Sequence, residues 1–525
     1  MSALDWIIII LYIALVVGMS YLIGRLQKNQ DDYYLGGRTL PPWQVGTSMV
    51  ANQVSAISLV GAPAFIAVRQ GGGLRWLQYE LAIPLAMIGI GSLLVPLLRS
   101  GSGVTIYEYL ERRFGSGTRL IMSFIFLLSR SLATGVALLA TSYVTSVCID
   151  LPLNMTILII GIVSLVYTAL GGIKADIYSD ILQLVVLWVS SVVLIWLLWS
   201  LLCGDIRMPA DAGERLRVFD LSSAGTGRGN SYSFWPMFLG GLFLYISYYG
   251  CDQSQAQRLL ATRDSRGAQK SLLLNGILRF PLVLTYCAVG VLIIPFMARY
   301  PEFGEKVMKL PPDFLMPHFF RDFVPPGLLG VIVAGVFAAS MSSLDSAINS
   351  LSAATWDDFL VRIFARLSDI QDRRKIRISR LITVFWGFFA TSAAIMMAGG
   401  ADTVIELVNK IGSAFYGPIA GVFILGVISK RSGQRAAITG LISGVVLNLV
   451  LWKGFPGISW MWWNLTGFSA TLFAGLAAGC WGGKYRQGRD IVKISAPMPR
   501  VFIAVLLSWF LFITGICLWI HFISL

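Results

Sequence analysis

The sequence has little charge, almost no histidine and no recognisable catalytic motif. Only 13% of its 525 residues are charged, and its two histidines, His318 and His521, lie far apart in the chain. Zinc hydrolases use an HExxH helix, serine hydrolases a GxSxG turn and nucleotide-binding enzymes a glycine-rich phosphate loop. None of these patterns occurs in the sequence. We therefore expect that the protein is not an enzyme.

The cysteines and the basic residues are also not clustered in a pattern that indicates a binding site. The six cysteines are scattered, and most lie inside apolar runs, which fits neither a disulfide framework nor a metal site. The net charge of +14 is spread over many loops instead of forming one basic patch interleaved with aromatic residues. This distribution favours membrane topology and predicts no nucleic-acid partner.

The sequence is rich in long apolar segments. Hydrophobic residues make up 56% of the chain, the mean hydropathy is +0.73, and apolar runs near twenty residues follow one another with short polar loops between them. This pattern predicts an all-α polytopic membrane protein with about fourteen transmembrane helices. The predicted spans are 5–25, 42–67, 76–98, 119–147, 153–170, 177–203, 234–254, 272–297, 327–352, 377–398, 402–428, 433–452, 460–482 and 499–522.

Lysine and arginine collect in the loops after the odd-numbered spans. The loop after the seventh span, for example, is predicted to carry Arg258, Arg263, Arg266 and Lys270. Short basic loops stay cytoplasmic, so we predict a multi-pass protein of the plasma (inner) membrane with the N- and C-termini outside. The two longest outer loops are about 204–232 and 298–326, and "PPDFLMPHFF" in the second predicts a short outer helix or lid.

Two apolar runs are interrupted by polar residues at mid-membrane. They are "VANQVSAIS" (50–58) and "SYYGCDQSQAQR" (247–258). Discontinuous segments at matching places in two halves are typical of inverted-repeat transporters, with the binding site between them. We therefore predict a single transporter domain in which 5–25 precedes two five-helix repeats, 42–203 and 234–428, and three helices follow in 433–522.

The stretch "AASMSSLDSAINS" (338–350) carries an unusual number of oxygens for a membrane helix. Helical spacing puts Ala339, Ser342, Ser343 and Ser346 on one face, with Asp345 beside it. A single serine there is commonly a packing residue, but an intramembrane carboxylate costs at least ~2.5–3.5 kcal/mol and calls for a cation or a basic partner.

A dehydrated monovalent cation needs several oxygen ligands, and an interrupted helix frees backbone carbonyls that can supply them. In the first interruption, Ala51 and Val54 lie one turn apart. We therefore predict a cation site between this segment and the serine-rich face.

Five segments together resemble signature motifs of the sodium:solute symporter family, whose members include sodium/sugar, proline and sialic acid symporters. They occur in order over most of the chain: "DDYYLGGRTLPPWQVGTSMVANQVSA" (31–56), "YEYLERRFG" (107–115), "YTALGGIKADIYSDILQ" (167–183), "DQSQAQRLLA" (252–261) and "AASMSSLDSAINSLSAATWDDF" (338–359). The resemblance implies the inverted-repeat five-plus-five (LeuT-like) fold and sodium-coupled solute import by alternating access.

The resemblance also implies where sodium binds. The common site falls on the backbone carbonyls of Ala51, Val54 and Ala339 and on the hydroxyls of Ser342 and Ser343. A second site, present in some members, falls on Ser342, Asp345, Ser346 and Asp180. The chain departs from the sialic acid relatives by having Asp345 where serine is expected, so either sodium binds more tightly or one acid is protonated. The alternative for Asp180 is helix-end capping or a salt bridge with Lys174 or a basic loop.

The solute site rests on a different set of polar residues. Arg130 lies too deep in its helix to reach water easily, and a guanidinium there suits bidentate capture of a carboxylate, as the resemblance to sialic acid symporters implies. The alternative is a buried pair with Glu80 or Asp252. By resemblance to sugar-transporting relatives, Glu80, Asp252 and Arg279 would bind sugar hydroxyls, although the last two differ in residue type. Gln53, Ser55 and Ser58 would line the unwound segment in either interpretation.

Several alternatives stay open at this point. The solute is an acid sugar such as sialic acid, another organic acid or a neutral sugar, and one or two sodium ions accompany it. A proton-coupled carrier is a rival, because Asp180 and Asp345 offer a proton relay. A membrane sensor is disfavoured, since the 525 residues contain no kinase-sized soluble segment. The sequence makes no prediction about oligomeric state.

Overall fold

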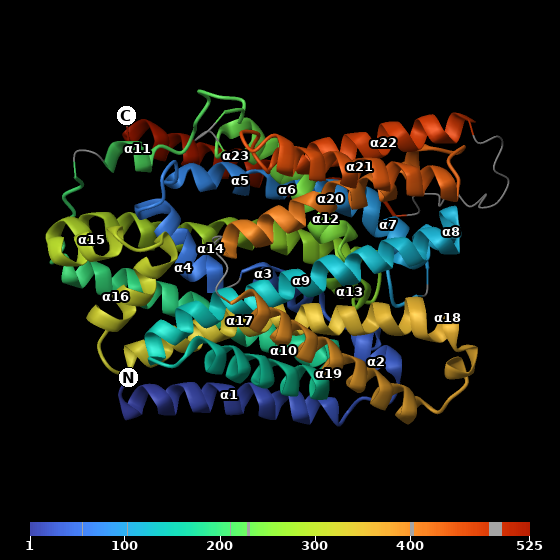
Figure 1. Ribbon diagram of the computed structural model, residues 1–525, viewed down its shortest axis with the longest axis horizontal. Coiled ribbons are helices and arrows are strands. Elements are labelled where there is room, and N and C mark those ends of the chain that lie inside the picture. Colours follow the sequence, from blue (N-terminus) through green and yellow to red (C-terminus); the bar gives the residue numbers. More distant parts are fainter. Residues whose placement is uncertain are drawn as a thin grey trace.

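The computed structural model describes residues 1–54, 56–101, 103–209, 212–227, 231–398, 404–481 and 496–524. This part of the chain is helical and contains no strand, only the isolated bridges Leu40↔Thr262 and Thr226↔Ile458. Most of the long helices run side by side along the longest axis of the molecule (Figure 1). The all-helical class predicted from the apolar runs is confirmed.

The helices have the following bounds. The α-helices are α1 (Ala3–Gly24), α2 (Gln30–Leu35), α3 (Pro42–Gln53), α4 (Ala56–Ala67), α5 (Leu77–Glu80), α6 (Ala82–Gly89), α7 (Val95–Leu98), α8 (Tyr107–Phe114), α9 (Ser116–Ile149), α10 (Leu153–Leu201), α11 (Gly213–Leu216), α12 (Gly241–Cys251), α13 (Gln253–Leu260), α14 (Ser265–Arg299), α15 (Pro301–Met308), α16 (Leu315–Phe323), α17 (Leu328–Ala354), α18 (Val361–Ile363), α19 (Asp372–Met397), α20 (Val404–Ile428), α21 (Gln434–Gly454), α22 (Trp462–Trp481) and α23 (Arg500–Ile523). The 3₁₀- and π-helices are η1 (Gly36–Arg38), η2 (Leu74–Trp76), η3 (Ile90–Leu94), η5 (Pro236–Gly240), η6 (Pro312–Phe314), η7 (Thr355–Leu360) and η8 (Ala365–Ser368).

Each predicted span overlaps one or more of these helices. Within the described residues, nine helices are long and apolar enough to cross a membrane, and the bent pair α3–α4 makes a tenth. The 49-residue α10 covers two predicted spans, and Gly172 interrupts it with a φ of 58° and a ψ of −174°. A Cβ at Gly172 would meet the Tyr33 carbonyl at 2.6 Å, so glycine is needed there for both conformation and space. The number of spans stays a prediction.

Both predicted interruptions occur. The axes of Pro42–Gln53 and Ser58–Ala67 differ by 53°, and Val54 at the end of α3 is extended, with φ −84° and ψ 106°. Asp252, with φ −88° and ψ 127°, separates α12 from α13, and its carboxylate accepts a hydrogen bond from the Ser254 amide at 2.8 Å. A short polar side chain at such a position satisfies amides that the next helix leaves open.

The serine-rich α17 lies at the centre of the molecule. It packs on α1, α3, α9, α10, α13 and α19. In its most apolar window 83% of the residues are buried, compared with 17% in α23. α23 therefore presents most of its apolar surface outward, whereas α17 turns its surface toward the other helices, which is the setting in which intramembrane polar residues are retained.

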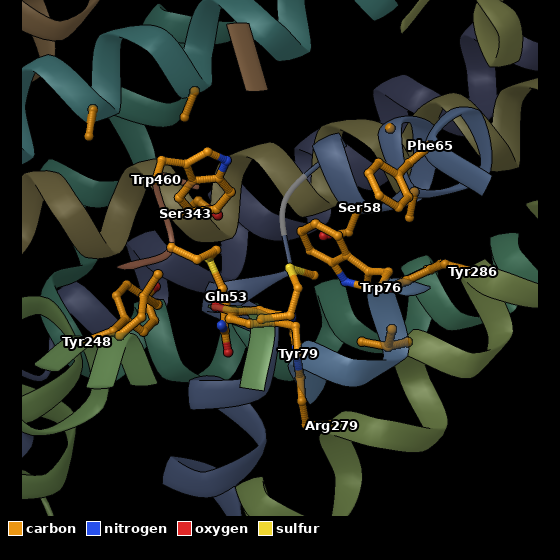
Figure 2. A pocket seen from close by; sticks show the side chains of 18 of the residues that line it. Gln53, Ser58, Phe65, Trp76, Tyr79, Tyr248, Arg279, Tyr286, Ser343 and Trp460 are labelled. Atoms are coloured by element: carbon orange, nitrogen blue, oxygen red, sulfur yellow. The ribbon is translucent and has the colours of Figure 1, made fainter. Parts of the chain in front are cut away.

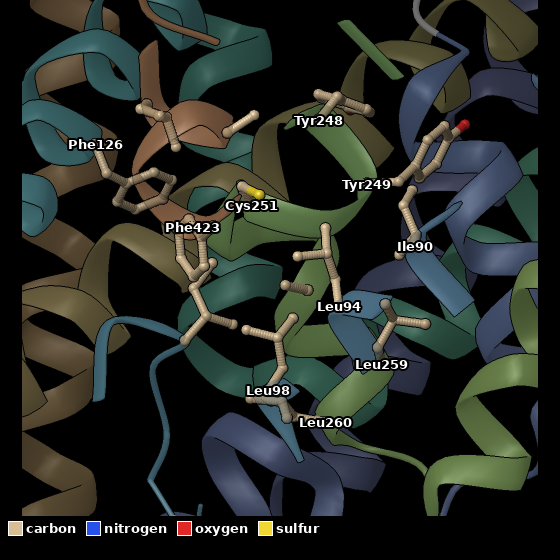
Figure 3. Packing of buried hydrophobic residues seen from close by; sticks show 14 of the residues in the cluster. Ile90, Leu94, Leu98, Phe126, Tyr248, Tyr249, Cys251, Leu259, Leu260 and Phe423 are labelled. Carbon is tan, nitrogen blue, oxygen red and sulfur yellow. The ribbon is translucent and has the colours of Figure 1, made fainter. Parts of the chain in front are cut away.

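The interrupted helix α12–α13 is fixed by apolar packing. Cys251, Leu259 and Leu260 pack in one cluster with Ile90, Leu94 and Leu98 of η3 and α7 (Figure 3). A Cβ at Gly250 would overlap the Leu94 side chain, so glycine permits the close approach of the two helices. This packing sets the position of the break at Asp252.

Both chain ends lie at the end of the molecule that carries α11, α15 and α16 (Figure 1). The "PPDFLMPHFF" stretch forms η6 and most of α16, as predicted for a short outer helix. Which side of a membrane this end faces stays a prediction.

Candidate functional site

A cavity of about 240 Å³ lies between the two helix interruptions. Both halves of the chain line it: Gln53, Ser58 and Phe65 come from α3 and α4, Tyr248 from α12, and Ser343 from α17. Figure 2 shows these side chains around one space, together with Trp76, Tyr79, Arg279, Tyr286 and Trp460. An aromatic cavity with a few convergent polar groups is the usual form of a small-molecule site.

Arg130 of α9 lines this cavity and is only partly neutralised. Its Nη1 lies 3.9 Å from Asp252 Oδ2, and its Cζ lies 5.9 Å from the centre of the Tyr248 ring. Among the residues that the structure describes, nothing hydrogen-bonds to its buried Nε. Asp252 is occupied further by the Ser254 amide and hydroxyl, at 2.8 and 2.5 Å. The acid therefore sits behind Arg130 and leaves part of the guanidinium to the cavity.

Arg279 of α14 also lines the cavity, and Glu80 of α5 lies behind it. Arg279 Nε and Nη2 donate to the Glu80 carboxylate at 3.2 and 3.3 Å. Trp76 Nε1 and the Tyr245 hydroxyl donate to the same carboxylate, each at 3.2 Å. Glu80 thus accepts from four donors, whereas the buried Nη1 of Arg279 has no partner in the described part of the chain.

The predicted solute residues therefore separate into two groups. Gln53, Ser58, Arg130 and Arg279 line the cavity, and Gln53 also accepts a hydrogen bond from the Tyr249 hydroxyl. Glu80 and Asp252 stand behind the two arginines. Ser55 lies outside the described residues. The buried-pair alternative for Arg130 holds for Asp252, at a distance too long for a hydrogen bond, and Glu80 pairs with Arg279 instead.

Among the first set of predicted sodium residues, Ser343 of α17 lies against the end of α3. The Ser343 hydroxyl lies 3.0 Å from the carbonyl oxygen of Asn52 and 3.4 Å from that of Ala339. Asn52 stands between Ala51 and Val54, and the Val54 amide turns back onto the Ala51 carbonyl at 3.2 Å. The Ser343 hydroxyl and the Asn52 carbonyl therefore meet across the two segments beside the cavity.

The second set is also brought together, deeper between α10 and α17. The Ser342 hydroxyl donates to Asp180 Oδ1, and the Ser48 hydroxyl donates to Asp180 Oδ2 at 2.5 Å. Asp345 accepts from the Tyr167 hydroxyl at 2.8 Å and from the Ser346 hydroxyl at 3.0 Å. All these side chains except Tyr167 belong to α3, the second half of α10 or α17.

Comparison with known proteins agrees with this arrangement. The sequence profile of the sodium:solute symporter family matches residues 33–444. The chain belongs to this family. It is thus a sodium-coupled symporter and not an enzyme, as expected from the motifs, and sodium is its coupling ion.

Curated relatives of the symporter carry several solutes. The sodium-coupled monocarboxylate transporter 2 of Danio rerio is 28% identical over 83% of this chain and 69% of its own length. The sodium/sialic acid symporter NanT of Aliivibrio fischeri is 26% identical over 86% of this chain and 88% of its own. The sodium/iodide cotransporter of Homo sapiens is 26% identical over 85% of this chain and 69% of its own.

Solved structures establish the fold of the symporter. The substrate-bound outward-open state of a Na⁺-coupled sialic acid symporter is 22% identical and has a TM-score of 0.81, covering 93% of this chain and 99% of that one. A closed conformation of Mhp1, a nucleobase-cation-symport-1 family transporter, is 15% identical with a TM-score of 0.57, covering 90% and 97%. The predicted LeuT-like fold is confirmed.

One residue of the symporter's buried polar cluster was placed wrongly from sequence. Arg258 was predicted in a cytoplasmic loop, but it lies in α13 and is 1% exposed. Its Nη2 pairs with Asp180 at 2.9 Å, its Nε donates to the Ser48 hydroxyl at 2.7 Å, and its guanidinium also contacts the Ser346 hydroxyl. Arg258, and not Lys174, is thus the basic partner of Asp180.

Asp176 was also missed. It lies one turn before Asp180 in α10 and accepts a hydrogen bond from the Asn349 amide at 2.9 Å, while its Oδ1 has no partner among the described residues. The signal that sequence reasoning overlooked was the number of intramembrane acids. Asp176, Asp180 and Asp345 together require at least one buried cation.

Proposed function

We propose that this symporter imports a small organic anion, held through its carboxylate, together with sodium by alternating access. The observation that carries the proposal is a pair of buried donors, Arg130 Nε and Arg279 Nη1, on two arginines that line one cavity; neither donor has a partner among the described residues. A buried N–H without an acceptor costs free energy, and a carboxylate supplies charged acceptors in the planar geometry of a guanidinium.

The charge of the cavity supports an anionic solute. Its charged lining residues, within the described chain, are Arg69, Arg130, Arg279 and Asp313. Positive charge therefore exceeds negative charge along the walls. Monocarboxylates, sialic acid and iodide, which are named for relatives of this chain, are anions as well.

Glu80 argues against a neutral sugar in this cavity. In the sugar-transporting interpretation a sugar hydroxyl would bind Glu80, but that carboxylate already accepts from four donors and lies behind Arg279. Binding a sugar there would require breaking the Glu80–Arg279 pair inside the membrane, which leaves both charges unpaired.

We propose one sodium site at the oxygens of Ala51, Val54, Ala339, Ser342 and Ser343. The proposal is supported by Ser343 Oγ, which lies 3.0 Å from the carbonyl oxygen of Asn52, between Ala51 and Val54, and 3.4 Å from that of Ala339 in its own helix. Because Ser343 also lines the solute cavity, sodium bound at this site would stabilise the walls of the solute site.

A second sodium is proposed at Asp180, Ser342, Asp345 and Ser346. Three buried carboxylates, Asp176, Asp180 and Asp345, face one guanidinium, Arg258. One further cation would bring this cluster closer to neutrality, which favours binding in a low-dielectric interior. The plasma-membrane location with both termini outside belongs to this proposal, and the position of both chain ends at the same end of the molecule supports a shared side (Figure 1).

The test is competition of uptake by matched acid and amide forms of one solute, for example lactate and lactamide, with sialic acid as a larger acid. We expect the acids to compete and the amide not to. Loss of a charged partner in a desolvated site costs ~2–5 kcal/mol, so Arg130→Ala should lower affinity for the acid by at least ~30-fold. Arg130→Lys should rescue only part of this loss, because lysine lacks the planar fork.

Arg207→Ala is the matched control, because the Arg207 side chain is 90% exposed and lies outside the cavity. Its affinity for the acid should equal that of the wild type. Equal competition by acid and amide, or no binding of either acid, would overturn the proposal of an anionic solute.

A further inference from the structure

The cavity does not end at the two buried arginines. Its lining continues from Asn52 and Ser343 to Arg69, which follows α4, and to Pro312 and Asp313 of η6. η6 packs against α4, α15 and α16, at the end of the molecule that carries both chain termini (Figure 1). A solute that approaches the cavity along this lining meets Arg69 and Asp313 before it meets Arg130.

Aromatic side chains surround Arg69. Its Cζ lies 6.0 Å from the centre of the Tyr232 ring, and Tyr232 packs edge-on against Phe65 with ring centres 4.8 Å apart. Phe65 in turn packs on Trp76 at 5.4 Å. A side chain also holds the backbone at this point, because Arg215 Nη1 donates to the Arg69 carbonyl at 3.0 Å. The guanidinium is thus carried on an aromatic platform, where cations are stabilised.

Asp313 is the acid that shares the cavity with Arg69. Burial raises the pKa of the Asp313 carboxyl, and the Arg69 guanidinium opposes this rise. Arg69 therefore favours the charged form of Asp313, and the acid occupies the basic end of the cavity when no anion is bound there.

The structure assigns an outer anion subsite to Arg69 and Asp313: we propose that Arg69 receives the solute carboxylate first and that Asp313 is the counter-ion that the solute displaces. This inference rests on the proposed anionic solute. It predicts that Asp313 competes with the solute, so that any change that neutralises Asp313 strengthens anion binding from that side.

Four other polar or charged residues near η6 contact one another. Lys306 of α15 pairs with Asp322 at 2.7 Å, and Arg321 contacts Asp322 at 3.0 Å and His318 at 3.2 Å. Burial, together with Lys306 and Arg321, lowers the pKa of His318 below its usual range. The charged or titratable residues on the elements packed against η6, with the segment after α4, are Arg69, Glu302, Glu305, Lys306, His318, Arg321 and Asp322.

The experiment measures KM for uptake in cells that express the full chain, with whichever of lactate or sialic acid the wild type transports. Both acids stay ionised between pH 5.5 and 7.5. Arg69→Gln should raise KM by about tenfold or more, the effect expected for loss of a charged hydrogen bond, with little change in the maximal rate. Asp313→Asn should lower KM at pH 7.5.

The external pH gives a second, independent readout. As pH falls from 7.5 to 5.5, more Asp313 is protonated, its competition for Arg69 weakens, and KM of the wild type should fall. Asp313→Asn should have a low KM at both values. His318→Gln is the control and should keep the pH response of the wild type.

The inference is overturned if Arg69→Gln leaves KM unchanged, or if Asp313→Asn raises KM as Arg69→Gln does, since the latter result indicates a merely structural pair. A pH response that persists in Asp313→Asn contradicts it as well. These failures differ from failure of the proposed function, in which acid and amide compete equally in the wild type whatever the outer residues do.

Discussion

Replacing Arg258 by methionine leaves Asp180 buried without its basic partner. The pair is 2.9 Å long, and its side chains are 2% and 0% exposed. Removing one partner of a buried ion pair costs ~3–5 kcal/mol, because the remaining charge is neither solvated nor paired. Unfolding entropy scales as ~2.1 cal per mol and kelvin per residue, which for 525 residues is about 1.1 kcal/mol per kelvin. We therefore expect Tm to fall by at least ~3 °C.

The second mutation separates this ion pair from general packing damage. Asp180→Asn alone should also lower Tm, because it removes the carboxylate that pairs directly with Arg258. The double variant Arg258→Met/Asp180→Asn removes both charges, so its loss should be well below the sum of the two single losses.

The assay is thermal melting of the purified full chain in detergent, without sodium and with saturating sodium. Arg258→Met makes the cluster of Asp176, Asp180 and Asp345 more negative, so it should show a larger sodium-dependent rise in Tm than the wild type. Additive losses in the double variant would refute the pairing energy of Arg258 and Asp180. A sodium effect on Tm that is unchanged in Arg258→Met would refute the second cation site.

Two further changes test other parts of the site. Ser343→Ala removes a ligand from a site with few oxygens and should raise the sodium concentration for half-maximal uptake several-fold while Tm without sodium stays near that of the wild type; an unchanged half-saturation would place the cation elsewhere. Glu80→Gln leaves Arg279 unpaired, so it should lower the free energy of unfolding by ~3–5 kcal/mol and lower Tm accordingly. It should preserve the preference for acid over amide. A loss of that preference would instead make Glu80 a direct solute ligand.

The sequence predicts the helices of this protein well because the membrane imposes their length. α1 and α23 follow apolar runs that contain few polar residues and none that interrupts the helix. The breaks at Val54 and Asp252 were also predictable, since polar residues cluster in the middle of otherwise apolar runs. α10 was less predictable. Polar residues near its middle predicted a loop between two spans, whereas in the structure a single glycine, Gly172, separates its two halves.

The site was predictable only in part. Resemblance placed Ser343 near the end of α3, and the structure brings these oxygens together. The sequence did not reveal the buried position of Arg258. Counting basic residues in loops assigns each arginine to a loop or a span only from the residues next to it in the chain. The burial of Arg258 depends on Asp180 and Ser48, which lie far from it in sequence. The aromatic lining was hidden for a similar reason, since residues such as Tyr248 and Trp76 look like ordinary members of apolar segments.

The short helix α13 connects the solute side of the site with its cation side. At its start, Asp252 stands behind Arg130 of the cavity, and later in the same helix Arg258 pairs with Asp180. Arg258 Nη1 also donates to the Ser254 carbonyl at 2.8 Å, so the arginine is tied to the turn that Asp252 caps. A displacement of α13 therefore changes both charge pairs at once. If binding of solute alters the position of α13, it changes the free energy of binding sodium, and the reverse holds as well. This helix therefore supplies a physical basis for reciprocal coupling between solute and sodium.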